Sequence, residues 1–172
     1  MLITSDLIDN RKYPLPSSLV EGKLKKQKMI KFLKTEDVLS LRSIVLREGK
    51  RSLEECVFEN DDALDSFHLG YLIGDEIICV ASFHHQSKEE FAGNAFQLRG
   101  MATAEEHRGK GYGNLLVNFA ITYLRGQKVN YVWCNAREKA FRFYQSLGFE
   151  FISDQFDIPG IGPHKTMYCK IQ

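Results

Sequence analysis

Apolar residues recur along this chain with two different periods, and the two kinds of segment follow one another. Four stretches in the first two thirds of the chain are short, rich in apolar and β-branched residues, and bounded by polar or glycine-containing segments, which predicts strands. Gly74 and Asp75 separate two of them and predict a hairpin turn. Gly100, inside another, predicts a β-bulge or the close approach of a second backbone. These predicted strands span residues 29–33, 68–74, 76–85 and 94–103.

Helical spacing appears in three other segments. Residues 35–47 carry an apolar stripe, with Thr35 as the expected N-cap and Gly49 as the stop. A longer helix is predicted over 112–125, and a third over 138–147, ending at Gly148. The stripe expected to face the core in the second helix consists of Tyr112, Leu115, Leu116, Phe119, Ala120, Tyr123 and Leu124.

Strands are predicted again at 129–136, 149–153 and 165–171, and the segment DIPGIGPH before the last one looks irregular. The order strand, loop, helix, strand across residues 96–133 is typical of a βαβ-type crossover. The fold class is therefore α/β, with one mixed sheet flanked by helices.

Length and charge set further limits. With 172 residues and a net charge of +1, the chain is expected to form a single domain without a general affinity for nucleic acid or membranes. Residues 1–27 contain prolines and a serine pair and are interpreted as an N-terminal extension to a domain over 28–172. No signal-like or membrane-spanning apolar run is present, and the four cysteines lack metal-binding or redox spacing, so we expect a cytoplasmic protein without a bound metal.

The loop RGKGYG, residues 108–113, is the most informative stretch. It joins a predicted strand to the N-terminus of the longest predicted helix, where unpaired backbone N–H groups and the helix dipole favour anions. Glycine allows a ligand to approach the backbone, and two cations add local charge. The loop therefore predicts a site for a phosphate or diphosphate.

Known phosphate-binding patterns can be compared with this loop. The dinucleotide pattern G-x-G-x-x-G fails because Asn114 follows at the third glycine position, and no acidic residue ends the next strand. The Walker pattern fails because Lys110 is followed by Gly111 and not by Ser or Thr. A glycine turn that holds no ligand is the remaining alternative from the loop alone.

Two blocks together resemble the GCN5-related N-acetyltransferase (GNAT) superfamily. R-G-K-G-Y-G is similar to its Q/R-x-x-G-x-G/A signature, and residues 135–150 are similar to its A-x-x-x-Y-x-x-x-G-F segment. The matching positions in the second block are Ala140, Tyr144, Gly148 and Phe149. The resemblance extends in element order over roughly residues 28–172.

The resemblance implies a mostly antiparallel sheet that is splayed at a cleft for acetyl-CoA. The pyrophosphate would lie on the backbone of Arg108, Gly109, Lys110, Gly111, Tyr112 and Gly113. The pantetheine arm would pair like an extra strand with Met101, Ala102 and Thr103. Lys139 or Arg142 could reach the ribose phosphate. Many relatives carry Asn three residues before the matching Ala, where this chain has Arg137, so Asn135 is the expected substitute in cofactor contact.

The reaction implied is attack by a primary amine on the thioester carbonyl. It requires a neutral amine, donors for the oxyanion and a proton for the departing sulfur. The resemblance makes Tyr144 the general acid, and backbone N–H groups near 101–103 could bind the oxyanion. An acyl-cysteine on Cys134 is less favoured, because no base is evident beside it.

The acceptor side is less defined. His164 is the first candidate for the base, with His84 and His85 as alternatives. Arg99 could bind an acidic group of the acceptor or pair with an internal carboxylate. The sequence does not choose the amine, and a homodimer is possible. The competing hypothesis is an acyl-CoA-binding module without turnover, used for sensing or assembly, with a dinucleotide-binding domain as a distant third.

Overall fold

The computed structural model describes residues 26–89 and 91–172. The predicted N-terminal extension, 1–27, lies outside the described residues except for its last two, so the boundary at residue 28 stays a prediction. No helix within the described part is long and apolar enough to cross a membrane.

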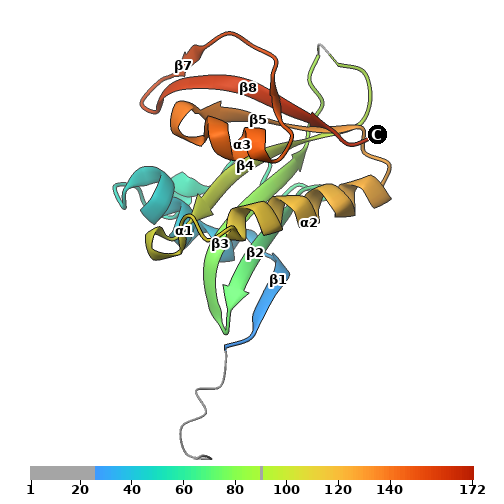
Figure 1. Cartoon of the computed structure of the whole chain (residues 1–172). Coiled ribbons are helices and arrows are strands. Elements are labelled where there is room, and N and C mark those ends of the chain that lie inside the picture. The colour runs from blue at the N-terminus through green and yellow to red at the C-terminus, as the bar shows by residue number, and fades with distance from the viewer. Residues whose placement is uncertain (1–25, 90) are drawn as a thin grey trace, which may run out of the picture.

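Three α-helices, three short 3-10 helices and eight strands alternate along the described chain (Figure 1). The helices are α1 (Thr35–Arg47), η2 (Glu54–Cys56), η3 (Glu105–His107), α2 (Tyr112–Gly126), η4 (Glu138–Ala140) and α3 (Phe141–Ser146). The strands are β1 (Lys28–Leu33), β2 (Phe67–Ile73), β3 (Glu76–His85), β4 (Ala95–Thr103), β5 (Tyr131–Arg137), β6 (Glu150–Phe151), β7 (Phe156–Ile158) and β8 (Gly162–Lys170).

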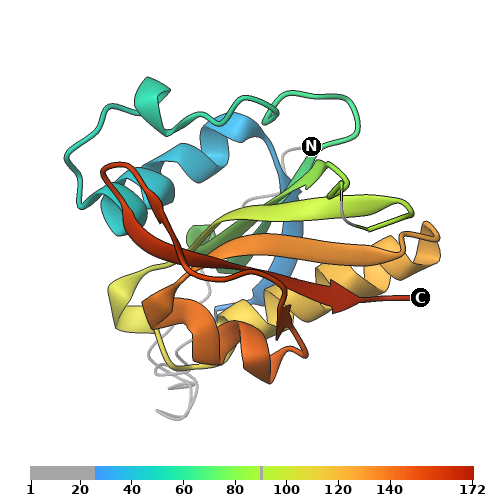
Figure 2. The ribbon, with the colours of Figure 1, turned by 90° about the horizontal axis from the view of Figure 1, so that it is seen from above.

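The strands form one mixed sheet in the order β1-β2-β3-β4-β5-β8-β6, with β7 paired to β8. Among the described strands only β4 and β5 run parallel, and α2 connects them, which confirms the predicted crossover. Helix α1 covers one face of the sheet, whereas α2 and α3 cover the other (Figure 2). The α/β class with a mostly antiparallel sheet is thus confirmed.

Strands β4 and β5 separate soon after they meet. Their register runs only from Ala95 opposite Tyr131 to Gln97 opposite Trp133. Beyond Gln97, the rest of β4 has no partner on its β5 side among the described strands. The predicted irregularity at Gly100 is confirmed, since the β3–β4 register shifts between Val80 and Ser82 and Gly100 has φ +60°.

The buried face of α2 is rotated from the predicted stripe. Leu116, Ala120 and Leu124 are fully buried as expected, together with Val117. The prediction was wrong for Leu115, Phe119 and Tyr123, which are 51%, 39% and 37% exposed. Phe119 and Tyr123 lie toward the edge of the sheet, where Phe32 of the edge strand β1 meets them at ring-centroid distances of 6.2 and 5.1 Å. Periodicity identified the helix, but the sheet beneath it decides which side is covered.

Two local predictions were also wrong. Thr35 is the first residue of α1 and not its N-cap: the cap is Lys34, whose backbone N–H donates to Asp37 Oδ2 at 3.0 Å. The segment expected to be irregular, 157–164, instead belongs to a hairpin between β7 and β8, closed by a backbone hydrogen bond from Ile161 to Ile158. Glycine in the turn allows this tight reversal, and the hairpin places residue 164 in a strand.

A buried polar network joins α1 to the sheet. Arg42 donates to both carboxylate oxygens of Asp61, with Nη2 at 2.9 Å, and to the hydroxyl of Ser82. His84 Nε2 lies 3.0 Å from Asp61 Oδ1. Burial raises the pKa of Asp61, but hydrogen bonds from Arg42 and His84 outweigh it and hold the pKa far below its usual range.

Removing the charge of Asp61 should therefore destabilise the fold. Asp61→Asn is expected to lower the free energy of unfolding by roughly 3 to 5 kcal/mol, because it leaves the Arg42 guanidinium buried without a counterion. The folded pKa of Asp61 lies below the unfolded value of about 3.9. The stabilisation by the Asp61 carboxylate is therefore complete above roughly pH 5, and it is lost as the pH falls below the unfolded pKa toward the lower folded pKa. Urea denaturation at several pH values measures both effects, with Asp157→Asn on the exposed part of β7 as the control. An unchanged stability in Asp61→Asn would contradict this view of the network.

Candidate functional site

A cavity of about 760 Å³ opens where β4 and β5 part. Residues from both layers of the fold reach it: the end of α1 and the segment after it on one side, and the glycine loop, α2 and α3 on the other. The parting of two parallel strands leaves main-chain groups of β4 facing this space. The cavity is thus a place where an extended ligand could run through the sheet.

The glycine loop and the mouth of α2 line one end of the cavity. Gly111 is the N-cap residue with φ +81°, a conformation that favours glycine, and a side chain there would meet no atom within 4 Å. Gly109 is equally open. The first helical N–H to find a partner is that of Leu115, which donates to the Gly111 carbonyl at 3.1 Å. The preceding N–H groups therefore face the opening, as an anion site requires.

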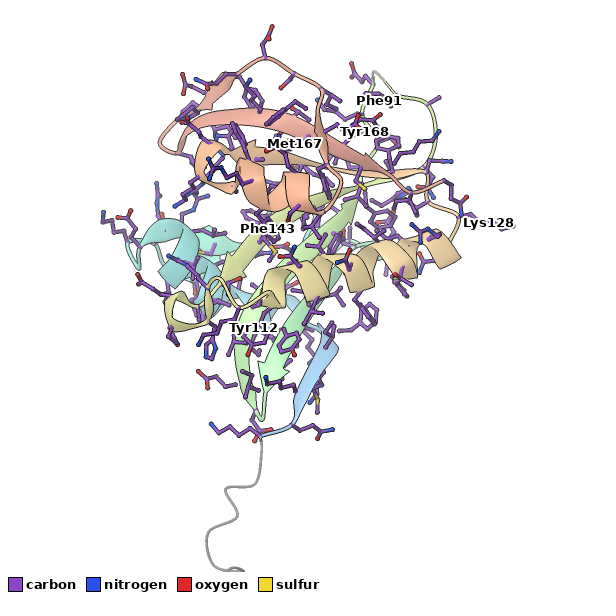
Figure 3. All side chains as sticks on the ribbon, in the orientation of Figure 1. Phe91, Tyr112, Lys128, Phe143, Met167 and Tyr168 are labelled. Carbon is purple, nitrogen blue, oxygen red and sulfur yellow. The ribbon has the colours of Figure 1, made fainter. Side chains whose placement is uncertain are left out.

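Gly113 serves a different purpose from the two loop glycines. A Cβ added there would lie 2.9 Å from Met101 Cε and 3.0 Å from a ring carbon of Phe143. Tyr112 stands beside it at the first turn of α2, and Phe143 belongs to the neighbouring helix α3 (Figure 3). The absence of a side chain at 113 lets α2 begin close to β4 and α3, which fixes the helix mouth at the cavity.

Tyr144 lies deep in the same cavity, on α3, and is 7% exposed. Burial, and next to it the thiol of Cys134, raise the pKa of Tyr144 well above its ordinary value. The hydroxyl therefore stays protonated at neutral pH and can donate a hydrogen bond to a group in the cavity.

His164 faces the cavity from β8, opposite Arg137 in the strand register. Its Nδ1 lies 2.7 Å from the Gly162 carbonyl, and its ring stacks on Phe156. A carbonyl only accepts, so Nδ1 carries the proton and Nε2 of the neutral ring keeps its lone pair. The alternatives are held elsewhere: His84 is fully buried against Asp61, and His85 contacts Asp65 and Asn94.

Asn135 and Arg99 stand on the two strands that part. Asn135 is exposed at the cavity, and its side-chain carbonyl accepts a hydrogen bond from Thr166 Oγ1 at 3.0 Å, which leaves its amide N–H₂ available. The Arg99 guanidinium lies 4.4 Å from the centroid of the Phe58 ring. Arg99 forms no ion pair with any carboxylate of residues 26–89 and 91–172. Of the two roles considered from the sequence, the pairing with an internal carboxylate is therefore not found among these residues.

The structure brings most predicted site residues to one cavity. Those that line it are Arg99, Met101, Thr103, Arg108, Gly109, Gly111, Tyr112, Gly113, Asn135, Lys139, Tyr144 and His164. Ala102 and Lys110 do not line it, and neither does Arg142. The side chain of Ala102 packs against the α1 side of the sheet, so at that position only the main chain is available to a ligand.

Sequence reasoning missed the wall of the cavity that faces α1. Val45, Leu46 and Arg47 come from the last turn of α1, and Phe58 from the segment after η2. Ile158 and Ile161 come from the β7–β8 hairpin. These residues belong to no sequence motif. The prediction of a helix over 35–47 places Arg47 at a helix end, but it does not show that this end lies at the cavity.

Comparison with known proteins agrees with this geometry. A model of the Acetyltransferase (GNAT) family matches residues 32–149. "Uncharacterized N-acetyltransferase YitI" of Bacillus subtilis (strain 168) is 39% identical over 140 residues, covering 81% of this chain and 93% of that protein.

Among solved structures, an aminoglycoside 6'-N-acetyltransferase complexed with coenzyme A has a TM-score of 0.67 at 14% identity, covering 84% of this chain and 97% of its own. Escherichia coli ElaA has a TM-score of 0.65 at 18% identity, covering 83% of this chain and 99% of its own. FeeM, an N-acyl amino acid synthase from uncultured soil microbes, has a TM-score of 0.70 at 11% identity, covering 85% of this chain and 92% of its own. These structures share the fold. Because the family model spans more than half of the chain and the Bacillus relative matches most of it, the chain belongs to the GNAT family of N-acetyltransferases.

Proposed function

We propose that this protein transfers the acetyl group of acetyl-CoA directly to a primary amine. One observation carries the proposal: a single cavity joins the open amides at the α2 mouth, the unpaired edge of β4 and a buried, protonated phenol. A diphosphate, an amide-containing arm and a thioester sulfur follow one another in CoA in that order.

Binding would use main chain more than side chains. The pyrophosphate would accept hydrogen bonds from N–H groups of residues 109–113, aided by the helix dipole. The pantetheine amides would pair with β4 beyond Gln97, in the manner of an added strand. Arg108 and Lys139 add positive charge at the cavity, and Asn135 offers its amide from the facing strand. The coenzyme A complex of the aminoglycoside enzyme, which has the same fold, supports this choice of carrier.

In the reaction, the amine nitrogen forms a bond to the acetyl carbon and the carbon–sulfur bond breaks. The proton lost by the amine would pass to Nε2 of His164, directly or through water, and Tyr144 would donate a proton or a strong hydrogen bond to the departing sulfur. Main-chain N–H groups of β4 near Met101 would stabilise the oxyanion. An alkyl ammonium with a pKa near 10.4 is neutral in only about one molecule in 2,500 at pH 7, which is why a base is needed.

Direct attack fits the environment of Cys134 better than an acyl-cysteine route. The side chain is 1% exposed, and burial raises the pKa of its thiol far above its ordinary value. A thiolate is the nucleophilic form, and at this position it is strongly disfavoured. Cys134 is instead a neighbour that helps to keep the Tyr144 phenol protonated.

A thiol-release assay tests the proposal. Acetyl-CoA with a panel of primary amines should yield free CoA thiol in an amine-dependent manner, and the acetylated amine should be found by mass spectrometry. Binding of acetyl-CoA by calorimetry without thiol release across the panel would favour the alternative, a binding module without turnover. No binding would contradict both.

Several expectations from the sequence remain predictions. They are a cytoplasmic location with reduced thiols, the absence of a metal from the reaction, no nucleic-acid or membrane partner, and a possible homodimer. The four cysteines are unpaired in the structure, which agrees with reduced thiols.

A further inference from the structure

Three arginines line the part of the cavity that faces α1. Arg47 comes from the last turn of α1, Arg99 from β4 and Arg137 from the end of β5. None of the three forms an ion pair with a carboxylate in the described part of the chain. Three guanidinium groups without a paired carboxylate leave hydrogen-bond donors and positive charge in one cavity available to an anionic ligand.

The three side chains are held in place by other contacts. Arg137 Nη2 donates to the Leu46 carbonyl at 3.3 Å, so the side chain crosses from β5 to α1 over the opening between the strands. Burial lowers the pKa of Arg137, and the positive charge of Arg47 lowers it further, because the two guanidinium groups repel each other. Arg99 rests on Phe58, and burial likewise lowers its pKa.

The acidic groups of the described residues that lie nearby form no ion pair with this cluster. Asp61 is held in hydrogen bonds by Arg42 and His84, and its charge acts on Arg99 only through space. Glu48 is exposed and pairs with Lys50, and its charge acts on Arg137 only through space. Glu59 is exposed, and its charge acts on Arg99 only at a distance.

The cluster is set apart from the phosphate end of the cavity. Arg99 faces the α1 layer, as its contact with Phe58 and its register opposite Ser82 show, whereas the α2 mouth opens on the other face of the sheet (Figure 2). His164 adjoins the cluster, opposite Arg137 in register. The arginines therefore surround the space next to the base, where the acceptor amine would enter.

We propose that the acceptor is a primary amine that also carries an oxyanion group, a carboxylate or a phosphate, bound by Arg47, Arg99 and Arg137. The proposal rests on the proposed acetyl transfer and names the class of its acceptor. Guanidinium groups bind carboxylates and phosphates alike through paired N–H donors, so the cluster requires a negative charge on the acceptor. The experiment below distinguishes a carboxylate from a phosphate. Val45, Phe58 and Ile158 form an apolar wall of the same cavity, and a bound acceptor that displaced water from this wall would strengthen the charge pair.

Matched pairs of amines test the proposal with the intact protein. γ-Aminobutyrate is compared with its amide, and phosphoethanolamine with ethanolamine, by kcat/KM for thiol release. The anionic member of at least one pair should be preferred by on the order of 30-fold or more, since a desolvated charge pair is worth about 2 kcal/mol or more. A preference in the first pair only identifies a carboxylate site, and a preference in the second pair only identifies a phosphate site.

Variants then assign the preference to the cluster. Arg99→Gln should raise KM for the anionic amine by about 10-fold or more, leave KM for acetyl-CoA within about twofold and leave the neutral amine unaffected, and Arg99→Lys should recover part of the loss. Arg51→Gln is the matched control, because Arg51 is an exposed arginine paired with Glu55 and away from the cavity.

Three results would overturn the inference. Equal turnover of neutral and anionic amines would remove the anion requirement while leaving acetyl transfer intact. A rise in KM for acetyl-CoA alone in Arg99→Gln would assign the cluster to the phosphates of the carrier. No turnover of any amine would contradict the proposed function and this inference with it.

Discussion

Gly111→Asp is expected to weaken acetyl-CoA binding by about 100-fold or more. The substituted side chain would stand at the N-cap of α2, where the structure shows nothing within 4 Å of a Cβ, so no packing contact is lost. Its carboxylate would lie beside the pyrophosphate, and two like charges about 4 Å apart near a protein surface repel by roughly 4 kcal/mol. Calorimetric titration of the protein with acetyl-CoA measures the loss.

Gly148→Asp is the control for that experiment. Gly148 has the same φ, +81°, and is equally open, but it follows α3 and does not line the cavity. Both variants carry the same backbone cost of roughly 1 to 2 kcal/mol for a side chain at positive φ. Equal affinities of the two variants for acetyl-CoA would show that the α2 mouth does not hold the phosphates.

Tyr144→Phe is expected to lower kcat by about 100-fold or more with little change in acetyl-CoA affinity. The hydroxyl is the only part removed, the ring keeps its packing against Phe143 and Phe149, and general acid catalysis contributes typically 100-fold or more. Because the phenol pKa is raised, the proton remains in place through neutral and moderately alkaline pH. Steady-state kinetics with a fixed amine, combined with calorimetry, separate the effect on kcat from the effect on binding.

Tyr168→Phe provides the comparison for the Tyr144 experiment. Tyr168 lies on β8 against Phe91, remote from the cavity, so its hydroxyl should not matter for turnover (Figure 3). Should Tyr144→Phe retain the kcat of the unmodified protein, Tyr144 would be a packing residue and the proton would have to come from water.

The candidate phosphate loop could be located from the sequence because it is continuous in the chain. Arg108–Gly113 and the start of α2 follow one another directly, so one glycine pattern and one helical stripe were enough to predict a loop at a helix N-terminus, which the structure places at the cavity. The irregularity of β4 at Gly100 could also be predicted, because a glycine inside a strand pattern is a local signal.

The wall of the cavity that faces α1 could not be predicted in the same way. Arg47, Phe58 and Ile158 are far apart in the chain, and each is an ordinary residue of its own segment. Only the packing of α1 and of the β7–β8 hairpin around the parted strands brings them together. The exposure of Phe119 and Tyr123 was missed for a related reason: helical periodicity is a property of the helix alone, whereas burial depends on how far the sheet extends beneath it.

A crystal structure of the protein with bound coenzyme A tests the central claim most directly. The account predicts the pyrophosphate on the main-chain N–H groups of Gly109–Gly113, the pantetheine arm along β4 beyond Gln97 and the sulfur beside the Tyr144 hydroxyl. A nucleotide bound at any other surface, or a sulfur remote from Tyr144, would contradict it.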